Sequence, residues 1–133
     1  MIVTETQTKK IISVALSYLG HKYEHGFDCI GFVRNVYKHA GIDIPLISGT
    51  TFPPEEFNIM EDQLSNSPIG HLIFLKDRYD PRKERVWTHV VLTLSENECI
   101  HSSIFYGEKV SISNLQEIME KRYDFVPSKP PNE

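Results

Sequence analysis

Apolar residues recur at helical spacing near the start of the chain. Ile12, Ala15, Leu16 and Leu19 follow the i, i+3, i+4, i+7 pattern of one helical face, and Gly20 comes directly after them. Glycine after the last periodic residue favours a helix end, because it readily adopts the backbone conformation in which helices stop. The pattern therefore predicts an amphipathic helix that ends at Gly20.

A second helical segment begins at a cysteine. Asp28 is a good N-cap, because its carboxylate accepts a hydrogen bond from a free backbone N–H group of a helix start. The apolar positions that follow share one helical face, and Gly41 is a stop signal after them. These positions are Cys29, Val33, Val36, Tyr37 and Ala40. The sequence thus predicts a helix whose first residue is Cys29.

Loop residues dominate the middle of the chain. The segment 42–68 contains Pro45, Pro53, Pro54 and Pro68, with room for one or two helical turns at 55–64. A charged connection follows later, at residues 76–85, and is expected to lie in solvent.

Strand patterns fill most of the second half. Apolar runs or alternating apolar and polar residues predict strands at 72–75, 86–94, 98–103, 110–112 and 123–126. Asn114 provides an N-cap for a helix at 115–121. Helices first and antiparallel strands second predict an α+β fold.

Strand alternation brings two histidines to one face of a predicted hairpin. Side chains alternate between the two faces along a strand, so His89 lies on the face of Val91, and His101 on that of Ser103. A hairpin centred on Glu96 pairs His89 with Ser103 and Val91 with His101. This register predicts that the two imidazole rings lie near each other.

Length and composition are those of one ordinary domain. The 133 residues are 40% hydrophobic and 24% charged. Such a chain can bury about two thirds of its unfolded surface around a single core. We therefore expect residues 1–133 to form one domain, with a disordered tail at 128–133. A formal charge of −4, without a cluster of Lys and Arg, argues against a nucleic-acid partner.

The cellular location of the protein is inferred from its apolar runs and its cysteines. The uncharged run at residues 11–20 is too short to span a bilayer, so no membrane partner is expected. The start, MIVTETQTKK, lacks the apolar core of a secretory signal. This predicts a cytoplasmic protein, or delivery by a non-Sec route such as phage lysis or effector injection. Cys29 and Cys99 are interpreted as free thiols in a reducing compartment, with Cys99 inert in the core.

Cys29 and the two histidines are candidate catalytic residues. Backbone N–H groups and the dipole at a helix start favour a thiolate over a thiol. An imidazole beside the sulfur takes its proton, and a second polar side chain holds that imidazole in the right tautomer. The combination of Cys29, His89 and His101 therefore predicts a cysteine nucleophile. No cofactor and no metal are expected.

Four segments, in order along nearly the whole chain, match the pattern of a known family. They are FDCIGFVRNVYKHAGIDIP, IGHLIFL, THVVLTLSENECIHSS and YDFVPS. Together they resemble the NlpC-type cell-wall cysteine peptidases, whose nucleophile segment has the usual form Asp-Cys-Ser-Gly-Phe-Val, followed by Tyr and by Gly-Ile/Val-X-Leu-Pro. The second segment is similar to the family strand Gly-Asp-Leu-Ile/Val-Phe-Phe, the third to its His-Val-Gly-Ile-Tyr hairpin and the fourth to its closing strand.

The resemblance implies a fold and a role for each site residue. The fold would be papain-like α+β, with N-terminal helices packed on an antiparallel sheet or half-barrel and the nucleophile at a helix N-terminus. Cys29 would be the nucleophile, His89 the base and His101 the orienting residue. Tyr23 matches a family tyrosine that lies near the oxyanion site.

Several positions depart from the family pattern. Ile30 stands where the family usually has Ser, His71 where it has Asp, and Val91 where it often has Gly. Like Tyr23, the residues Asp28, Ile30 and His25 are expected on the oxyanion or substrate side of the cleft. The replaced hydroxyl at position 30 predicts an altered or relaxed substrate preference.

The function implied by the resemblance is hydrolysis of an amide bond in a peptidoglycan stem peptide, next to γ-linked D-glutamate. The partner would be a peptide or muropeptide, and an inhibitor or immunity protein would fit an injected effector. A thiol acyltransferase, or an amidase acting on a non-wall substrate, would use the same trio. The remaining alternatives are a zinc site with Cys29, His89 and His101 as three ligands, and a structural or binding domain with an inert Cys29.

Overall fold

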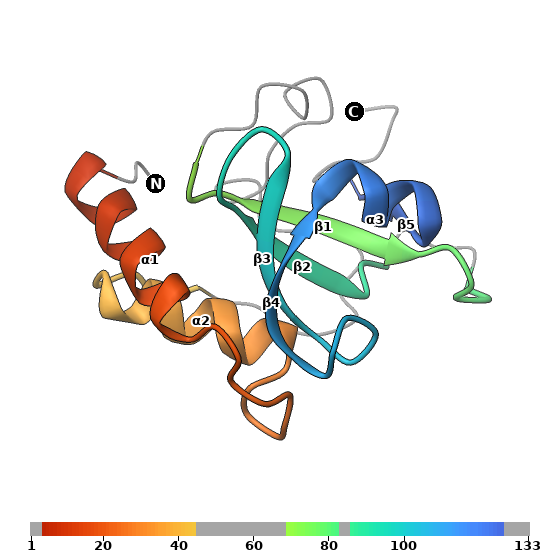
Figure 1. The fold of residues 1–133 in the computed structure, drawn as a ribbon, viewed down its shortest axis with the longest axis horizontal. Helices are drawn as coiled ribbons and strands as arrows, with labels where there is room; N and C mark the ends of the chain where they lie inside the picture. The colour runs from red at the N-terminus through yellow and green to blue at the C-terminus, as the bar shows by residue number, and fades with distance from the viewer. Residues whose placement is uncertain (1–3, 45–68, 83–85, 127–133) are drawn as a thin grey trace.

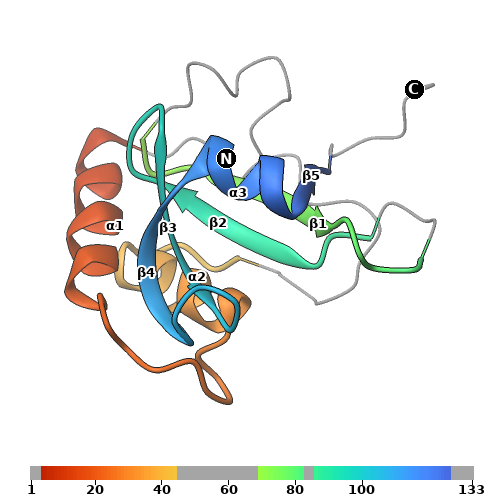
Figure 2. The ribbon, with the colours of Figure 1, turned by 45° about the vertical axis from the view of Figure 1, so that its right-hand side comes forward.

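Helices flank both faces of an antiparallel sheet (Figures 1 and 2). The computed structural model describes residues 4–44, 69–82 and 86–126. Within these residues the sheet has five strands in the order β4-β3-β2-β1-β5. The elements are α1 (Glu5–Ser17), α2 (Cys29–His39), β1 (Leu72–Asp77), β2 (His89–Thr93), β3 (Glu98–Ser103), β4 (Lys109–Asn114), α3 (Leu115–Lys121) and β5 (Tyr123–Phe125). The predicted α+β fold, with N-terminal helices packed on the sheet, is confirmed.

Helix α1 packs through a different stripe from the predicted one. Ile11 and Ala15 are fully buried, whereas Leu16 and Leu19 are 41% and 45% exposed. The prediction that Leu16 and Leu19 belong to the buried face is therefore wrong, and the helix itself ends at Ser17. The adjacent residues at positions 11 and 12 are both isoleucine, so the pattern alone does not tell which stripe contacts α2.

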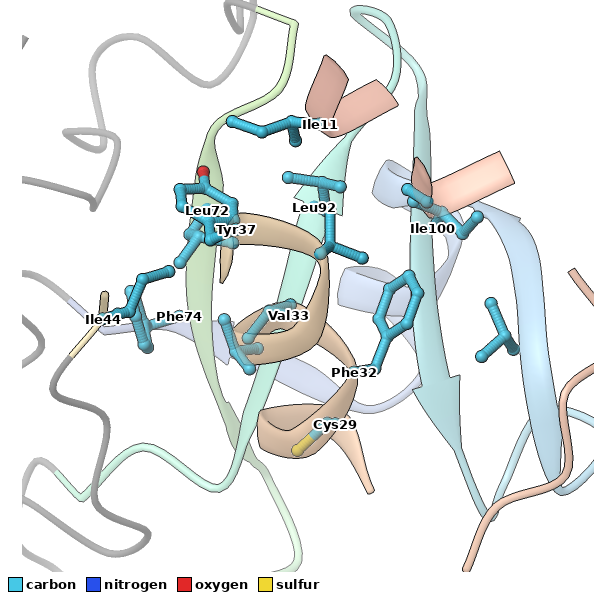
Figure 3. Close-up of a cluster of buried hydrophobic side chains, with 14 of the residues drawn as sticks. Ile11, Cys29, Phe32, Val33, Tyr37, Ile44, Leu72, Phe74, Leu92 and Ile100 are labelled. Atoms are coloured by element: carbon cyan, nitrogen blue, oxygen red, sulfur yellow. The ribbon is translucent and has the colours of Figure 1, made fainter. Parts of the chain in front are cut away.

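Helix α2 begins at Cys29, as predicted. The Asp28 carboxylate accepts a 2.8 Å hydrogen bond from the Gly31 N–H, which caps the helix start. The buried face of the helix packs against β2 and β3 through Phe32, Val33, Val36 and Tyr37. In Figure 3, Cys29 lies at one end of this apolar cluster. The burial of the other residues of this helix face therefore fixes the position of Cys29 relative to the sheet.

The hairpin of β2 and β3 has the predicted register. Leu92 pairs with Ile100 and Thr93 pairs with Cys99, so the hairpin is centred on residue 96. Strand β3 has the predicted bounds, whereas β2 starts at His89, three residues later than predicted. This register places the two histidine-bearing strand segments side by side.

A second apolar cluster lies on the other face of the sheet, against α3. The Asn114 side chain accepts a hydrogen bond from the Glu117 N–H and caps α3, as predicted. The buried cluster consists of Ile73, Leu75, Val91, Cys99, Leu115, Ile118 and Tyr123. Cys99 is fully buried in it, which agrees with its expected place in the core.

Two expectations concern residues outside the described ranges. The helical turns at 55–64 fall within residues 45–68, and the tail at 128–133 falls within residues 127–133. The end of the charged connection, at residues 83–85, also lies outside.

The loop between α1 and α2 runs along strands β3 and β4. The Gly20 and Tyr23 N–H groups each donate a 2.9 Å hydrogen bond, to the carbonyls of Val110 and Glu108. The Ser102 hydroxyl donates to the Phe27 carbonyl at 2.8 Å, directly before the start of α2. The sheet therefore holds the loop that leads to Cys29.

Gly31 lets this loop pass close to the first turn of α2. A Cβ atom at position 31 would overlap with the backbone carbonyl of Gly26. The contact is with backbone and not with the end of a flexible side chain, so the loop would have to move. Glycine at the third residue of the helix is thus required by packing.

Gly31→Ala is expected to lower the free energy of unfolding by about 1–2 kcal/mol. Overpacking costs about 1–3 kcal/mol, which exceeds the gain of up to about 1 kcal/mol from the better helix propensity of alanine. Denaturant unfolding measures the change, and Lys38→Ala, at an exposed position of the same helix, is the control. A Gly31→Ala protein as stable as the parent would contradict the packing argument.

Candidate active site

A cleft of about 280 Å³ lies where α2 meets the sheet. It is lined by residues of α2, of the strands β1, β2, β3 and β5, and of the loop between α1 and α2. Helix α2 contributes Cys29, strand β2 contributes His89, and strand β5 contributes Tyr123. Tyr23 reaches the cleft from the loop between α1 and α2. The cleft therefore brings together the predicted nucleophile, the predicted base and the tyrosine expected at the oxyanion site.

Behind the cleft, a line of hydrogen bonds runs from His89 to strand β4. His89 Nε2 lies 2.7 Å from His101 Nδ1, and His101 Nε2 lies 2.8 Å from the Ser113 hydroxyl. His89 is 5% exposed and His101 is fully buried. The sequence predicted the proximity of the two rings, and the structure adds Ser113 as a third member of the line.

The line can hold His89 in the tautomer that a base needs. With Nε2 protonated, His89 donates to His101 Nδ1, and His101 then donates from its own Nε2–H to the Ser113 oxygen. This leaves His89 Nδ1 without a proton and able to accept one. The opposite direction of both hydrogen bonds would place the proton of His89 on Nδ1, so the direction of the line decides whether His89 can act as a base.

Both imidazoles are neutral at neutral pH. Burial lowers the pKa of His101 to about 4. The pKa of His89 is also well below its ordinary value, first because of burial and second because of the nearby His101. Tyr123 covers the face of the His89 ring, with centroids 5.1 Å apart and planes 17° apart. The site therefore holds two neutral rings shielded from water.

Opposing effects act on the Cys29 thiol. Burial is the largest and raises its pKa to about 11, and the Asp28 carboxylate raises the pKa further. The backbone N–H groups of Val90, Ile30 and Cys29 itself lower the pKa. The predicted stabilisation of the thiolate by the helix start is therefore present, but burial outweighs it, and the resting thiol is protonated.

Cys29 and His89 share the cleft as a neutral pair. Among residues 4–44, 69–82 and 86–126, no hydrogen bond joins the Cys29 sulfur to the His89 ring. The Cys29 sulfur lies within hydrogen-bonding reach of the backbone of Val90, the residue after His89 in strand β2. The structure thus places the two groups together, and their roles as nucleophile and base stay predictions.

Tyr23 can donate a hydrogen bond in the cleft. Burial, and then the negative charges of ionised Cys29 and of Asp28, raise the pKa of its phenol. The phenol therefore keeps its proton and is a donor to an oxygen near Cys29. The role of Tyr23 at the oxyanion stays a prediction.

The other substrate-side candidates line a different hollow. His25, Asp28 and Ile30 surround it together with Arg34 and Lys38 of α2. His25 is exposed, and Asp28 is the helix cap described above. The structure therefore separates these three residues from the cleft that contains Cys29 and Tyr23, although Asp28 and Ile30 flank Cys29 in the chain.

Sequence reasoning missed several residues of the site. Ser113 follows Lys109 and Ser111 at alternating positions of β4, and this polar alternation was the available signal. Asp77 and Arg122 line the cleft as an ion pair. The expectation that residues 76–85 are only a solvated connection is wrong for Asp77.

Metal binding and membrane insertion find no support in the described parts of the chain. There, no three His, Cys, Asp or Glu side chains come together in a group suited to a metal ion. The alternative in which Cys29, His89 and His101 hold zinc therefore lacks a ligand cluster. None of the described helices has the length and apolar character needed to cross a membrane.

Comparison with protein families identifies one match. The model of the NlpC/P60 family matches residues 16–127, which include the loop before α2, helix α2 and the five strands of the described sheet. A search of curated proteins found no match.

Solved NlpC/P60 structures share the fold. A family protein from Bacillus cereus is 27% identical over 92% of this chain and 40% of that chain, with a TM-score of 0.66. The NlpC/p60 domain of the peptidoglycan hydrolase SagA is 29% identical over 92% and 98%, with a TM-score of 0.63. RipD from Mycobacterium tuberculosis, described as a non-catalytic domain protein adapted to peptidoglycan binding, is 20% identical over 84% and 90%, with a TM-score of 0.56.

The coverage of these matches differs. The chain spans less than half the length of three of the solved chains, the Bacillus cereus protein among them. It spans nearly all of the SagA domain. The similarity therefore concerns the NlpC/P60 domain.

Ser113→Ala is expected to change the tautomers of both histidines. Without the hydroxyl, the buried His101 Nε2–H loses its acceptor, which costs about 1–3 kcal/mol and favours protonation of His101 on Nδ1. The fraction of His89 with its proton on Nδ1 should then rise. Long-range ¹⁵N–¹H NMR spectra measure both tautomers, and Ser113→Thr, which keeps a hydroxyl, is the control. Unchanged tautomers in Ser113→Ala would show that Ser113 does not fix the line.

Asp28→Asn is expected to lower the pKa of Cys29. Asparagine is also a good N-cap, so the change removes the charge and keeps the helix cap. The rate of alkylation of Cys29 by iodoacetamide at pH 8 should increase, because a larger fraction is thiolate. Peptide mass analysis measures the rate.

Cys99 is the internal reference for this measurement. It is fully buried, and burial raises its pKa to about 12, so its alkylation should be much slower in both proteins. An unchanged rate at Cys29, or equal rates at the two cysteines, would contradict the electrostatic description of the cleft.

Proposed function

The chain belongs to the NlpC/P60 family, and on that basis we propose that it is a cysteine hydrolase that cleaves an amide bond in a peptidoglycan stem peptide, next to D-glutamate. The observation that carries the proposal is the shared cleft of Cys29 and His89, with the buried line of His101 and Ser113 behind His89. SagA is described as a peptidoglycan hydrolase, which supports a wall substrate.

The first step forms a thioester. When the substrate carbonyl lies against Cys29, the thiol proton passes to His89 Nδ1 and the sulfur attacks the carbonyl carbon. The oxyanion accepts hydrogen bonds from the Cys29 N–H and the Tyr23 hydroxyl. His89 then gives its proton to the leaving amine, the carbon–nitrogen bond breaks, and the acyl group remains on sulfur.

The second step releases the acid. His89, neutral again, takes a proton from water as the water oxygen attacks the thioester. The carbon–sulfur bond breaks, the sulfur recovers a proton from His89, and the carboxylic acid leaves. His101 accepts from His89 Nε2–H throughout, which stabilises the imidazolium that forms in each step.

The neutral resting pair suits this mechanism. Separate charges on Cys29 and His89 are disfavoured by burial, so proton transfer is coupled to attack by the sulfur. A substrate that fills the cleft brings the Cys29 thiol and the acceptor nitrogen of His89 together.

Substrate preference is proposed to differ from that of family members with serine after the nucleophile. Ile30 lines the hollow beside the cleft of Cys29 and not the cleft itself, so a substrate that extends from Cys29 into this hollow would meet an apolar side chain where those members offer a hydroxyl. We therefore expect stem-peptide cleavage with altered or relaxed preference. The same change keeps a thiol acyltransferase or a non-wall amidase as the second candidate function.

Cys29→Ala and His89→Ala should each reduce kcat by about 10³-fold or more, since members of a catalytic unit act together. His101→Asn should retain more activity than His101→Ala, because an amide oxygen can accept from His89 Nε2–H. The assay is incubation with purified muropeptides and mass analysis of the products. Cys99→Ala is the matched control, with the same substitution at the buried core cysteine.

Each outcome of this assay discriminates between functions. Equal loss in the two His101 variants, with folding intact by circular dichroism, would assign His101 a different role. Uncut muropeptides, together with transfer or release of an acyl group from another amide or thioester, would favour the acyltransferase or amidase. A folded protein with unreactive Cys29 and bound muropeptide would indicate a binding domain, as described for RipD.

A further inference from the structure

One corner of the cleft is formed by an arginine at the junction of α3 and β5. Arg122 Nε and Nη2 each lie 2.7 Å from Asp77 Oδ2, so Asp77 on β1 holds one edge of the guanidinium. Both residues line the same cleft as Cys29. The side chain of Arg122 is 26% exposed, so part of it faces the cleft solvent.

Aromatic rings cover the guanidinium. The Arg122 Cζ atom lies 3.5 Å from the centroid of Phe105 and 5.7 Å from that of Tyr79. Phe105 and Tyr79 also line the cleft and are 56% and 73% exposed. Large exposed aromatic residues at a cleft rim are suited to contact with a ligand. The planar cation is therefore fixed between a carboxylate and apolar surface at the edge of the cleft.

Arg122 retains hydrogen-bonding capacity. A guanidinium has five N–H donors, and Asp77 Oδ2 is its side-chain partner within the described residues. Nη1 makes no hydrogen bond in those parts of the chain. The other acidic residue of this corner, Asp80, is held by the backbone N–H and two side-chain nitrogens of Arg82. Arg122 can therefore donate further hydrogen bonds to a second carboxylate.

A different arginine, Arg78, connects β1 to the end of α3. Arg78 donates to the carbonyls of Met119, Glu120 and Tyr123, and so ties β1 to the end of α3. The connection between β1 and the α3–β5 junction therefore does not depend on Arg122 alone. The place of Arg122 in the lining of the cleft is therefore not explained by this connection.

The position of Arg122 identifies the part of the substrate that it meets. Arg122 precedes Tyr123, whose ring stacks on His89. In the proposed reaction His89 gives its proton to the leaving amine, so the leaving group lies on the His89 side of Cys29. Arg122 is therefore on the side of the cleft that receives the leaving-group fragment.

We propose that Arg122, held by Asp77 and covered by Phe105, forms a subsite that binds a carboxylate on the leaving-group side of the scissile amide. The proposal rests on the proposed hydrolase function, because that function defines the leaving-group side. The ligand class is an amino acid or short peptide with a free carboxylate close to its amino group. A planar guanidinium suits such a group because it donates two hydrogen bonds in one plane.

A pair of tripeptides tests the subsite. L-alanyl-γ-D-glutamyl-L-lysine is compared with the same tripeptide as its C-terminal carboxamide, so only the charge on the leaving lysine differs. The parent protein should cleave the acid with a kcat/KM about tenfold higher than the amide, the size expected for a charge-assisted hydrogen bond at a partly exposed site. Arg122→Gln should reduce this ratio to near one, mainly through KM.

Two further variants separate recognition from structure. Lys121→Gln removes the same charge from the adjacent residue, which pairs with Glu117 on the solvent side of α3, and should keep the tenfold ratio. Phe105→Ala removes the cover from the guanidinium at an exposed position and should lower the ratio without affecting folding. If Arg122→Gln does not fold, the ratio of acid to amide cleavage in Phe105→Ala tests the proposal, and an unchanged ratio there would overturn it.

The results can overturn the proposal in two ways. A ratio that persists in Arg122→Gln, or that falls equally in Lys121→Gln, would show that Arg122 does not read the carboxylate. If the parent cleaves neither peptide, the proposed function fails for these substrates, and calorimetric binding to Cys29→Ala decides the subsite. Tighter binding of the acid that is lost in Cys29→Ala/Arg122→Gln would support it, and equal or absent binding would overturn it.

Discussion

The site depends on how the first turn of α2 is held against the sheet. Apolar side chains of α2 pack on β2 and β3, and this packing brings Cys29 to the backbone N–H of Val90. The preceding loop fits only because Gly31 has no side chain, and the Ser102 hydroxyl fixes the loop at Phe27. The position of Cys29 is therefore a consequence of core packing at one end of the helix.

Burial has opposite effects on the two halves of the site. It raises the pKa of Cys29 and lowers the pKa values of His89 and His101, so that the resting groups are neutral. The same exclusion of water strengthens the hydrogen bonds from His89 to Ser113. The resting site thus has a protonated thiol, and the hydrogen bonds behind His89 can select its tautomer.

Much of this arrangement could be predicted from sequence, because local signals determine it. The Asp28 cap fixed the helix start, and the alternation around Glu96 fixed the hairpin register that pairs Leu92 with Ile100. The buried face of α1 could not be predicted, since Ile11 and Ile12 differ only in their tertiary contacts. Ser113, Asp77 and Arg122 were missed for a similar reason, because each pairs with a residue that is distant in the sequence.

The central claim is that Cys29 carries the acyl group during turnover. Rapid acid quenching of the protein with L-alanyl-γ-D-glutamyl-L-lysine, followed by peptide mass analysis, measures this most directly. We expect the L-alanyl-γ-D-glutamyl group on the peptide that contains Cys29, and unmodified Cys99. Release of lysine without an adduct at Cys29, or an adduct on another residue, would contradict the account.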